Sequence, residues 1–109
     1  NRIAIMADLT QEEWRARLEK DVNAVILDVR TNEEMEEGFI PGAVHLDIYK
    51  PQEFLEGLDA LDKAAHYYVY CRSGNRSGQA CALMTARGFS SAYNLAGGMN
   101  EWEGEVTIG

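Results

Sequence analysis

The most constraining feature of the sequence is the nearly continuous apolar run AVILDV at residues 24–29. A strand that packs on one face alternates apolar and polar residues, whereas a strand with an unbroken apolar run is buried on both faces. Such strands are typical of parallel sheets, whose crossover helices cover both sides. The run therefore predicts an α/β protein built around a parallel sheet.

The remaining segments alternate between strand and helix patterns, as this class of fold requires. Further strands are predicted at residues 43–48, 67–70 and 90–95. Helices are predicted at residues 11–20, 51–58 and 77–87, with short helical turns at residues 32–37 and within 97–102. Thr10 and Glu13 fit a capping box at the start of the first helix. Parallel sheets bind ligands at the carboxyl ends of their strands, and Cys71 lies at such an end.

Length and charge limit the classes of protein that the chain can represent. A chain of 109 residues fits a single domain, residues 1–109, with one hydrophobic core. The formal net charge of −8 argues against a nucleic-acid partner, which requires clustered basic residues. No apolar run reaches the roughly 20 residues of a transmembrane helix. We therefore expect no membrane association and a cytoplasmic location, although the start at Asn1 leaves a removed leader open.

The segment YVYCRSGNRSGQA at residues 68–80 places Cys71 between a strand and the start of a helix. A helix N-terminus leaves backbone N–H groups unpaired and carries a partial positive charge. A tight loop before it can aim further N–H groups inward and form an anion-binding nest. Gly74 supplies the backbone freedom that this curl needs, and Asn75 tolerates left-handed geometry. The pattern predicts an anion site with a thiol at its entrance.

Two arginines, Arg72 and Arg76, flank this loop, and we expect the side chain of Arg76 to face the surface. A local positive charge in an acidic protein favours a small anionic ligand. Helix N-termini and neighbouring arginines lower thiol pKa values, so Cys71 is predicted to be a nucleophile with a depressed pKa. A purely structural cysteine fits this setting poorly. The predicted anion-binding residues are Arg72, Ser73, Gly74, Asn75, Arg76 and Ser77.

Three segments make the chain resemble the rhodanese-like family of single-domain sulfurtransferases over nearly its whole length. LDVRTNEEMEEGFIPGA (27–43) resembles the family's first signature, YVYCRSGNRS its active-site loop, and NLAGGMNEW (94–102) its closing signature. The resemblance implies a three-layer α/β domain with a central five-stranded parallel sheet and helices on both faces. It also implies that Cys71 is catalytic and carries a persulfide. Phe39 replaces the family's usual His, which we interpret as local packing.

The implied reaction moves a sulfane sulfur from thiosulfate or a related donor to cyanide or a thiol acceptor. The Cys71 thiolate attacks the outer sulfur of the donor and expels sulfite, and the resulting persulfide then delivers its sulfur. The nest stabilises the negative charge on the persulfide while the arginines orient the anionic donor. This chemistry needs no metal, nucleotide or organic cofactor, so we expect none. A thiol or a protein sulfur acceptor is the expected second partner.

Two other functional classes remain open. Cysteine phosphatases, some of them with a rhodanese fold, place an arginine after five intervening residues, whereas four separate Cys71 from Arg76 here. The shorter loop encloses a smaller cavity, which favours sulfur over a phosphoryl group. Ser77 nevertheless echoes the phosphatase pattern, and arsenate reduction belongs to the same alternative. A sulfur-relay or binding module acting with a protein partner would use the same loop and differ in its acceptor.

The remaining cysteine and the histidines have structural interpretations. Cys81 lies on a helix and is predicted to be a buried, inert thiol too distant for a disulfide with Cys71. A Cys–His hydrolase is excluded because His66 starts the strand that Cys71 follows, about 16 Å away. His45 is interpreted as a packed or surface residue. The spacing of the cysteines and histidines makes a zinc site unfavourable.

Several other positions are interpreted as structural. Asp28 and Arg30 are predicted to form an ion pair near the sheet edge, and Gly97 with Gly98 a turn near the active-site rim. The acidic residues of the short helical turn are interpreted as a solvated face: Glu33, Glu34, Glu36 and Glu37. Trp14 and Trp102 are expected in or beside the core.

Overall fold

The apolar run at residues 24–29 forms β2 (Ala24–Asp28), an inner strand of a five-stranded sheet in this computed structural model of the protein. The structure describes residues 3–109. The sheet order is β1-β5-β4-β2-β3, and all neighbouring strands are parallel. The other strands are β1 (Ile5–Leu9), β3 (Val44–His45), β4 (His66–Tyr70) and β5 (Ser91–Leu95). The predicted central parallel sheet is confirmed.

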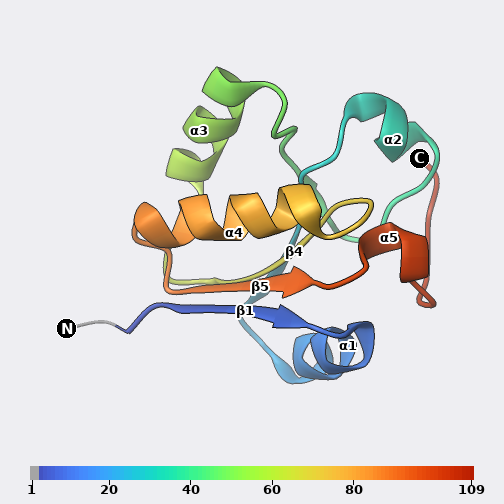
Figure 1. The fold of residues 1–109 in the computed structure, drawn as a ribbon, viewed down its shortest axis with the longest axis horizontal. Helices are drawn as coiled ribbons and strands as arrows, with labels where there is room; N and C mark the ends of the chain where they lie inside the picture. Colours follow the sequence, from blue (N-terminus) through green and yellow to red (C-terminus); the bar gives the residue numbers. More distant parts are fainter. Residues whose placement is uncertain (1–2) are drawn as a thin grey trace.

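Helices lie on both faces of this sheet (Figure 1). α3 (Pro51–Ala60) and α4 (Asn75–Ala86) cover one face, and α1 (Gln11–Lys20) covers the other. Two short helices, α2 (Asn32–Glu36) and α5 (Gly98–Glu101), lie beyond the strand ends. The arrangement is the predicted sandwich of helix, sheet and helix.

Two apolar clusters, one on each face of the sheet, hold the layers together. Phe54 of α3 and Met84 of α4 pack with Val69 in the first cluster. Trp14 of α1 packs edge-on against Tyr68 in the second, with ring centroids 5.7 Å apart. Successive residues of β4 point to opposite faces, so Tyr68 and Val69 enter different clusters. This alternation explains why an inner strand carries large, mainly apolar side chains on both faces.

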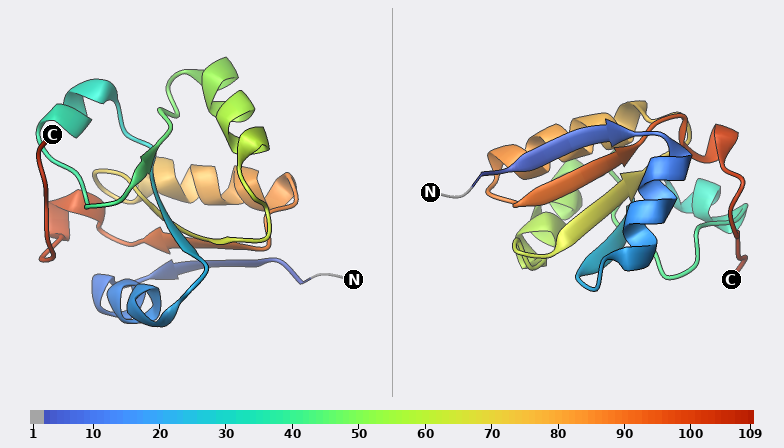
Figure 2. Two further views of the ribbon diagram at one scale, coloured as in Figure 1. Left: turned by 180° about the vertical axis from the view of Figure 1, so that it is seen from behind. Right: turned by 90° about the horizontal axis from the view of Figure 1, so that it is seen from below.

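All five strands point in the same direction, so their carboxyl ends meet at one edge of the sheet (Figure 2). The loop from β4 into α4 begins at this edge, and α2 and α5 lie beside it. The parallel topology therefore brings segments from the first, middle and last thirds of the chain to one place.

Most boundaries agree with the sequence prediction because their signals are local. The capping box of Thr10 and Glu13 is present, and Pro51 occupies the first turn of α3. α4 starts two residues earlier than predicted, at Asn75, and the strand predicted at 43–48 is limited to Val44–His45. β1 is the strand that the residue patterns did not predict. The question of a leader before Asn1 lies outside the described residues.

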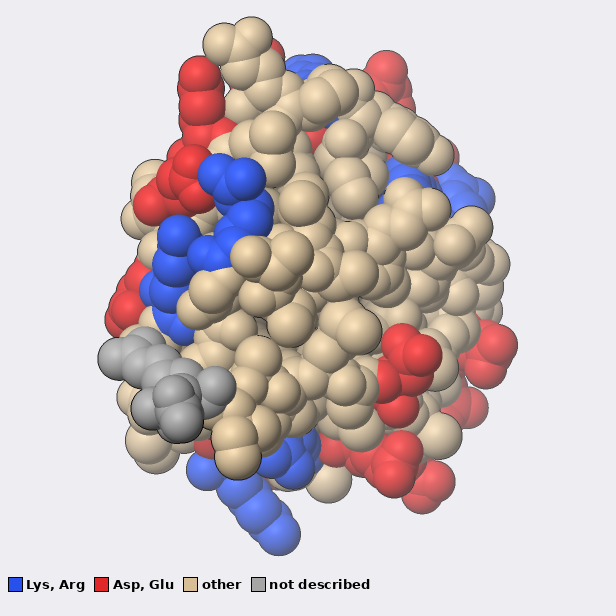
Figure 3. All heavy atoms as spheres, turned by 60° about the vertical axis from the view of Figure 1, so that its left-hand side comes forward, with Lys and Arg blue, Asp and Glu red and all other residues tan. Residues whose placement is uncertain are grey.

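Charged side chains are dispersed on the side of the molecule from which the strands start. Figure 3 shows basic and acidic side chains there in small, separate groups on a largely uncharged surface. Among residues 3–109, no helix combines the length and apolar character needed to cross a membrane.

Candidate active site

Cys71 directly follows β4, an inner strand, at the carboxyl edge of the sheet. The chain then curls into α4, whose N-cap Gly74 has a φ of 99°. Side chains are strained in this left-handed region, whereas glycine adopts it readily. A Cβ on Gly74 would also lie 3.2 Å from the carbonyl oxygen of Leu95. The left-handed turn thus favours glycine strongly, and the close approach to β5 leaves little room for a side chain.

Three hydrogen-bond donors converge on the sulfur of Cys71. The backbone N–H groups of Gly74 and Ser77 lie 3.2 and 3.4 Å from Sγ, and the Ser77 hydroxyl lies 3.3 Å from it. Burial raises the pKa of the Cys71 thiol, but the Ser77 hydroxyl and the N–H groups of Ser77, Gly74 and Ser73 together lower it below its ordinary value. The loop therefore favours the thiolate.

The two arginines of the loop bind Glu34 of α2. Nη1 and Nη2 of Arg76 donate to the Glu34 carboxylate at 2.7 and 2.8 Å, and Nε of Arg72 donates to it at 3.2 Å. Only 16% of the Arg76 side chain is exposed, so the expectation that it faces the surface is wrong. Hydrogen bonding to Glu34 chiefly raises the pKa of Arg76, and the Cys71 charge contributes less. The hydrogen-bond donors, more than the arginines, lower the thiol pKa.

The interpretation of the acidic helical turn as a solvated face is wrong for Glu34. Its side chain is 12% exposed, and it accepts hydrogen bonds from the N–H and the hydroxyl of Thr31, each at 3.1 Å. Glu33, Glu36 and Glu37 are exposed, as predicted. Residue 34 differs because it occupies the side of α2 that meets the arginines of the Cys71 loop.

α5 supports the Cys71 loop from the other side. The N–H groups of Met99 and Asn100 donate to the carbonyl oxygens of Cys71 and Arg72 at 3.0 and 2.9 Å. Gly98, with a φ of 53°, allows this approach, because a Cβ there would lie 2.5 Å from the Cys71 oxygen. The predicted glycine turn is confirmed, and it lies against the backbone of the loop.

Asn94 of β5 is a supporting residue that sequence reasoning missed. Its Nδ2 donates to the carbonyl oxygen of Gly74 at 3.0 Å and to Asp8 Oδ1 at 2.8 Å. Its Oδ1 is buried and has no partner among residues 3–109. The signal in the sequence was a polar amide within the predicted strand at residues 90–95, and in the structure β5 is buried at every position. Burying an amide is costly unless it is hydrogen-bonded, and the bond from Asn94 to Gly74 connects β5 to the Cys71 loop.

Cys81 lies in α4, inside the cluster on the α3–α4 face. Burial raises the pKa of its thiol to about 12, in agreement with the predicted inert cysteine. Both cysteines are free, as expected. Cys71 is itself fully buried, so burial does not distinguish the reactive candidate from the inert thiol.

The other predicted positions are placed as follows. Ser73 is exposed on the loop, and Asn75 is exposed at the first position of α4. His45 Nε2 lies 2.6 Å from the carbonyl oxygen of Arg30, which supports a packing role. Phe39 forms an antiparallel bridge with Thr107, consistent with local packing.

The predicted pair of Asp28 and Arg30 is confirmed. Nη2 of Arg30 donates to the Asp28 carboxylate at 2.8 Å, and both side chains are buried. Among residues 3–109, no group of three or more His, Cys, Asp and Glu residues is arranged to hold a metal ion.

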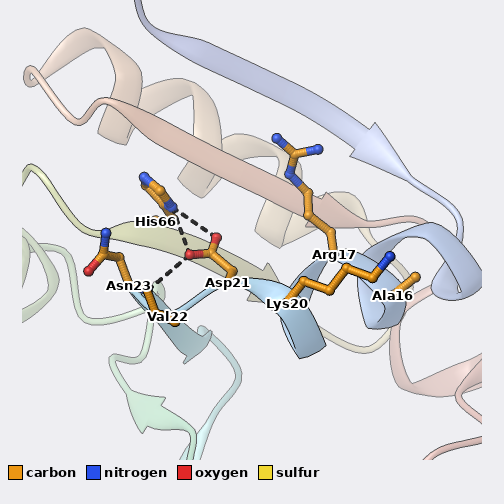
Figure 4. A pocket seen from close by; sticks show the side chains of 7 residues that line it. All are labelled: Ala16, Arg17, Lys20, Asp21, Val22, Asn23 and His66. Carbon is orange, nitrogen blue, oxygen red and sulfur yellow. Dashed lines mark hydrogen bonds and ion pairs between the residues drawn. The ribbon is translucent and has the colours of Figure 1, made fainter.

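A hollow of about 500 Å³ lies at the opposite end of the sheet from Cys71, between the end of α1 and the start of β4 (Figure 4). The Asp21 carboxylate at its centre pairs with His66 at 2.8 Å and accepts a hydrogen bond from the Tyr68 hydroxyl at 2.7 Å. Burial opposes the effect of these hydrogen bonds, which lower the pKa of Asp21. Because His66, the Tyr68 hydroxyl and the Asn23 N–H already bind the Asp21 carboxylate, we interpret the cluster as structural.

Comparison with known proteins agrees with this geometry. A model of the rhodanese-like domain matches residues 10–105. The Bacillus subtilis (strain 168) protein YtwF is 40% identical over 92 residues, which cover 84% of this chain and 85% of the relative. The thiosulfate sulfurtransferase GlpE of Pseudomonas syringae pv. syringae is 36% identical over 88 residues, with coverage of 81% and 80%.

A solved structure shows the same fold. The crystal structure of a rhodanese-like domain protein from Staphylococcus aureus superposes with a TM-score of 0.81 at 31% identity, and the match covers 95% of this chain and 99% of that one. The chain belongs to the rhodanese-like domain family. Its relatives include proteins named as sulfurtransferases.

Proposed function

We propose that the protein is a sulfurtransferase that carries a sulfane sulfur as a persulfide on Cys71. The observation that supports this most directly is the set of donors from Gly74 and Ser77 aimed at the Cys71 sulfur. Donors fixed in place before reaction stabilise negative charge wherever it develops. The same cradle therefore serves the thiolate before sulfur uptake and the persulfide afterwards.

The reaction has two displacement steps. The Cys71 thiolate attacks the outer sulfur of thiosulfate, a new S–S bond forms, and the donor's S–S bond breaks as sulfite leaves with the electron pair. Cyanide or a thiolate then attacks the outer sulfur of the persulfide, and the Cys71 thiolate leaves. No net oxidation or reduction of the protein occurs over the cycle. The relative named thiosulfate sulfurtransferase supports thiosulfate as the donor to test first.

The loop residues divide into two groups by their contacts. Gly74 and Ser77 hold the sulfur through their N–H and O–H groups. We assign the other four residues, Arg72, Ser73, Asn75 and Arg76, to binding the anionic donor. A low thiol pKa lets this chemistry proceed without a general base.

One observation favours phosphate-type chemistry as a second candidate. The Ser77 hydroxyl lies 3.3 Å from the thiol sulfur, where it could also protonate or stabilise a thiolate leaving group. The loop between Cys71 and Arg76 remains one residue shorter than the phosphatase pattern, which disfavours a whole phosphoryl or arsenate group. Delivery of sulfur to a protein partner is a variant of the main proposal, with the same persulfide.

Persulfide formation tests the proposal directly. Reduced protein is incubated with thiosulfate, desalted and analysed by intact and peptide mass spectrometry. We expect a gain of one sulfur atom on the Cys71 peptide, none on the Cys81 peptide, and loss of that sulfur on adding cyanide. A parallel assay measures hydrolysis of an aryl phosphate. If no sulfur is gained and the aryl phosphate is hydrolysed, the phosphatase alternative replaces the proposal.

A further inference from the structure

Glu34 of α2 accepts hydrogen bonds from two directions. Thr31, the N-cap of α2, donates through its N–H and hydroxyl in a capping box. Arg76 and Arg72 donate from the Cys71 loop, about forty residues further along the chain. Hydrogen bonding from Arg76 chiefly holds the pKa of the Glu34 carboxyl well below its usual range. Glu34 is therefore a fixed, ionised anchor beside the loop.

The contacts of Arg76 leave one edge of its guanidinium group uncommitted. Its two terminal nitrogens bind Glu34 end-on, and the ring of Tyr49 covers one face, with its centroid 5.3 Å from Cζ. Arginine has five N–H donors in a planar fork, so an end-on carboxylate uses two of them. The side edge, formed by Nε–H and the adjacent Nη–H, carries a fork that can bind a second anion. Nε has no acceptor among residues 3–109.

We propose that Glu34 is a positioning residue for the anionic sulfur donor. Its carboxylate holds the two terminal nitrogens of Arg76 in place. The side edge of the guanidinium, formed by Nε–H and the adjacent Nη–H, then binds the sulfonate oxygens of thiosulfate next to Cys71. The inference rests on the proposed function and adds to it the residue that orients the donor-binding arginine. Glu34 itself touches neither donor nor sulfur.

The opposite role would be a carboxylate that competes with the donor for Arg76. A competitor must be able to leave, whereas Glu34 is held by Thr31 from within its own helix and has a side chain that is 12% exposed. The two roles predict opposite changes in anion affinity when Glu34 is replaced. Removing a competitor tightens anion binding, whereas removing a positioning residue weakens it.

Glu34→Gln separates these roles while preserving the helix. Glutamine also completes a capping box with Thr31, so α2 keeps its N-terminal hydrogen bonds. Its amide, however, presents N–H groups where Arg76 also presents donors, and the end-on pair is lost. We expect KM for thiosulfate to rise about tenfold or more, from the loss of one charge-assisted contact, with kcat changed much less. Glu33→Gln, on the exposed face of the same helix, is the matched control and leaves KM unchanged.

A double-mutant cycle tests whether Glu34 acts through Arg76. If it does, Glu34→Gln adds nothing to the KM of Arg76→Gln, because the orienting contact is already absent. Multiplication of the two effects would overturn the proposal. So would an unchanged or lower KM in Glu34→Gln.

Anion binding is also measured without turnover, so that failure of the positioning role can be distinguished from failure of the proposed function. Sulfate, an unreactive probe for the sulfonate group, is titrated against alkylation of Cys71 by iodoacetamide. We expect sulfate to protect Cys71 in the wild type and the half-protecting concentration to rise about tenfold in Glu34→Gln. Absence of protection in the wild type, or equal protection in both proteins, would overturn the positioning role even if sulfur transfer is established.

Discussion

The two cysteines of this protein lie ten positions apart, in the same apolar cluster, yet their surroundings have opposite effects. Both are fully buried or nearly so, and burial raises the pKa of each thiol. Cys81 has only this influence and weaker repulsion from Asp8 and Cys71, so its pKa rises to about 12. Cys71 adds the donors of Ser77, Gly74 and Ser73, and its pKa falls below the ordinary value.

This difference shows that the chemistry of a buried thiol depends on where the backbone N–H groups point. In the middle of α4, each N–H donates to a carbonyl of the preceding turn and none is left for the Cys81 sulfur. At the start of α4, the first N–H groups have no helical acceptor, and the curl at Gly74 directs them to Cys71. Position relative to the helix end therefore decides which thiol can react.

The largest expected effect comes from removing each thiol in turn. Cys71→Ser should reduce thiosulfate-to-cyanide transfer to the assay background, because a serine hydroxyl stays protonated and cannot take up a sulfane sulfur. Cys81→Ala should keep most of the activity, since Cys81 contributes only packing. Circular dichroism and urea unfolding check that both variants fold. Substantial activity in folded Cys71→Ser would contradict the mechanism.

A second prediction removes the support that α5 gives to the loop. In Gly98→Ala, the new Cβ meets the Cys71 oxygen at 2.5 Å and the residue must also hold a φ of 53°, so the loop or α5 has to move. We expect unfolding free energy to fall by at least about 2 kcal/mol in urea titrations. Gly42→Ala is the control, because Gly42 has a φ of 85° but open space around it. An equal loss in both variants would show that strain in φ, and not contact with the loop, dominates.

The third prediction concerns one of the hydrogen bonds that make the pKa of Cys71 lower than that of Cys81. Ser77→Ala removes the hydroxyl 3.3 Å from the Cys71 sulfur. A hydrogen bond to a charged group contributes about 1.5–3 kcal/mol, so the pKa of Cys71 should rise by roughly one unit or more. The midpoint of the pH profile for iodoacetamide alkylation, followed by mass spectrometry, measures this shift. Ser73→Ala, which changes an exposed side chain, should leave the midpoint in place.

The smallest expected effect comes from comparing two carboxylates of α2, the largely buried Glu34 and the exposed Glu33. Arg76 lowers the pKa of Glu34, so its stabilising effect is fully present above the unfolded-state value of about 4.3 and is lost as the pH falls through the lower folded-state value. We therefore expect Glu34→Gln to lower the unfolding free energy at pH 7, with the difference from wild type shrinking toward pH 2. Glu33→Gln, which changes an exposed side chain of the same helix, is the control and should change the unfolding free energy at pH 7 much less.

Sequence patterns located most elements because their signals are local. Thr10 with Glu13 marks the start of α1, and Pro51 the start of α3. β1 was not predicted, although residues 3–9 (IAIMADL) form an apolar run like the one that forms β2. It is an edge strand, and its Ile5 and Met6 are exposed. The strand predicted at residues 43–48 was too long, because only Val44 and His45 pair with β2.

The sequence by itself determined the kind of sheet, the position of Cys71 at the end of a strand and the glycine-bearing turn into a helix. These depend on neighbouring residues, whose patterns act through the backbone geometry of a few turns. Only the tertiary structure decided that Glu34 binds Arg76, that Asn94 holds Gly74 and that Met99 supports Cys71. Each of these contacts joins segments twenty or more residues apart, and the order of strands in the sheet brings them together. A local pattern carries no information about that order, so a solvated glutamate and a buried anchor look alike in the sequence.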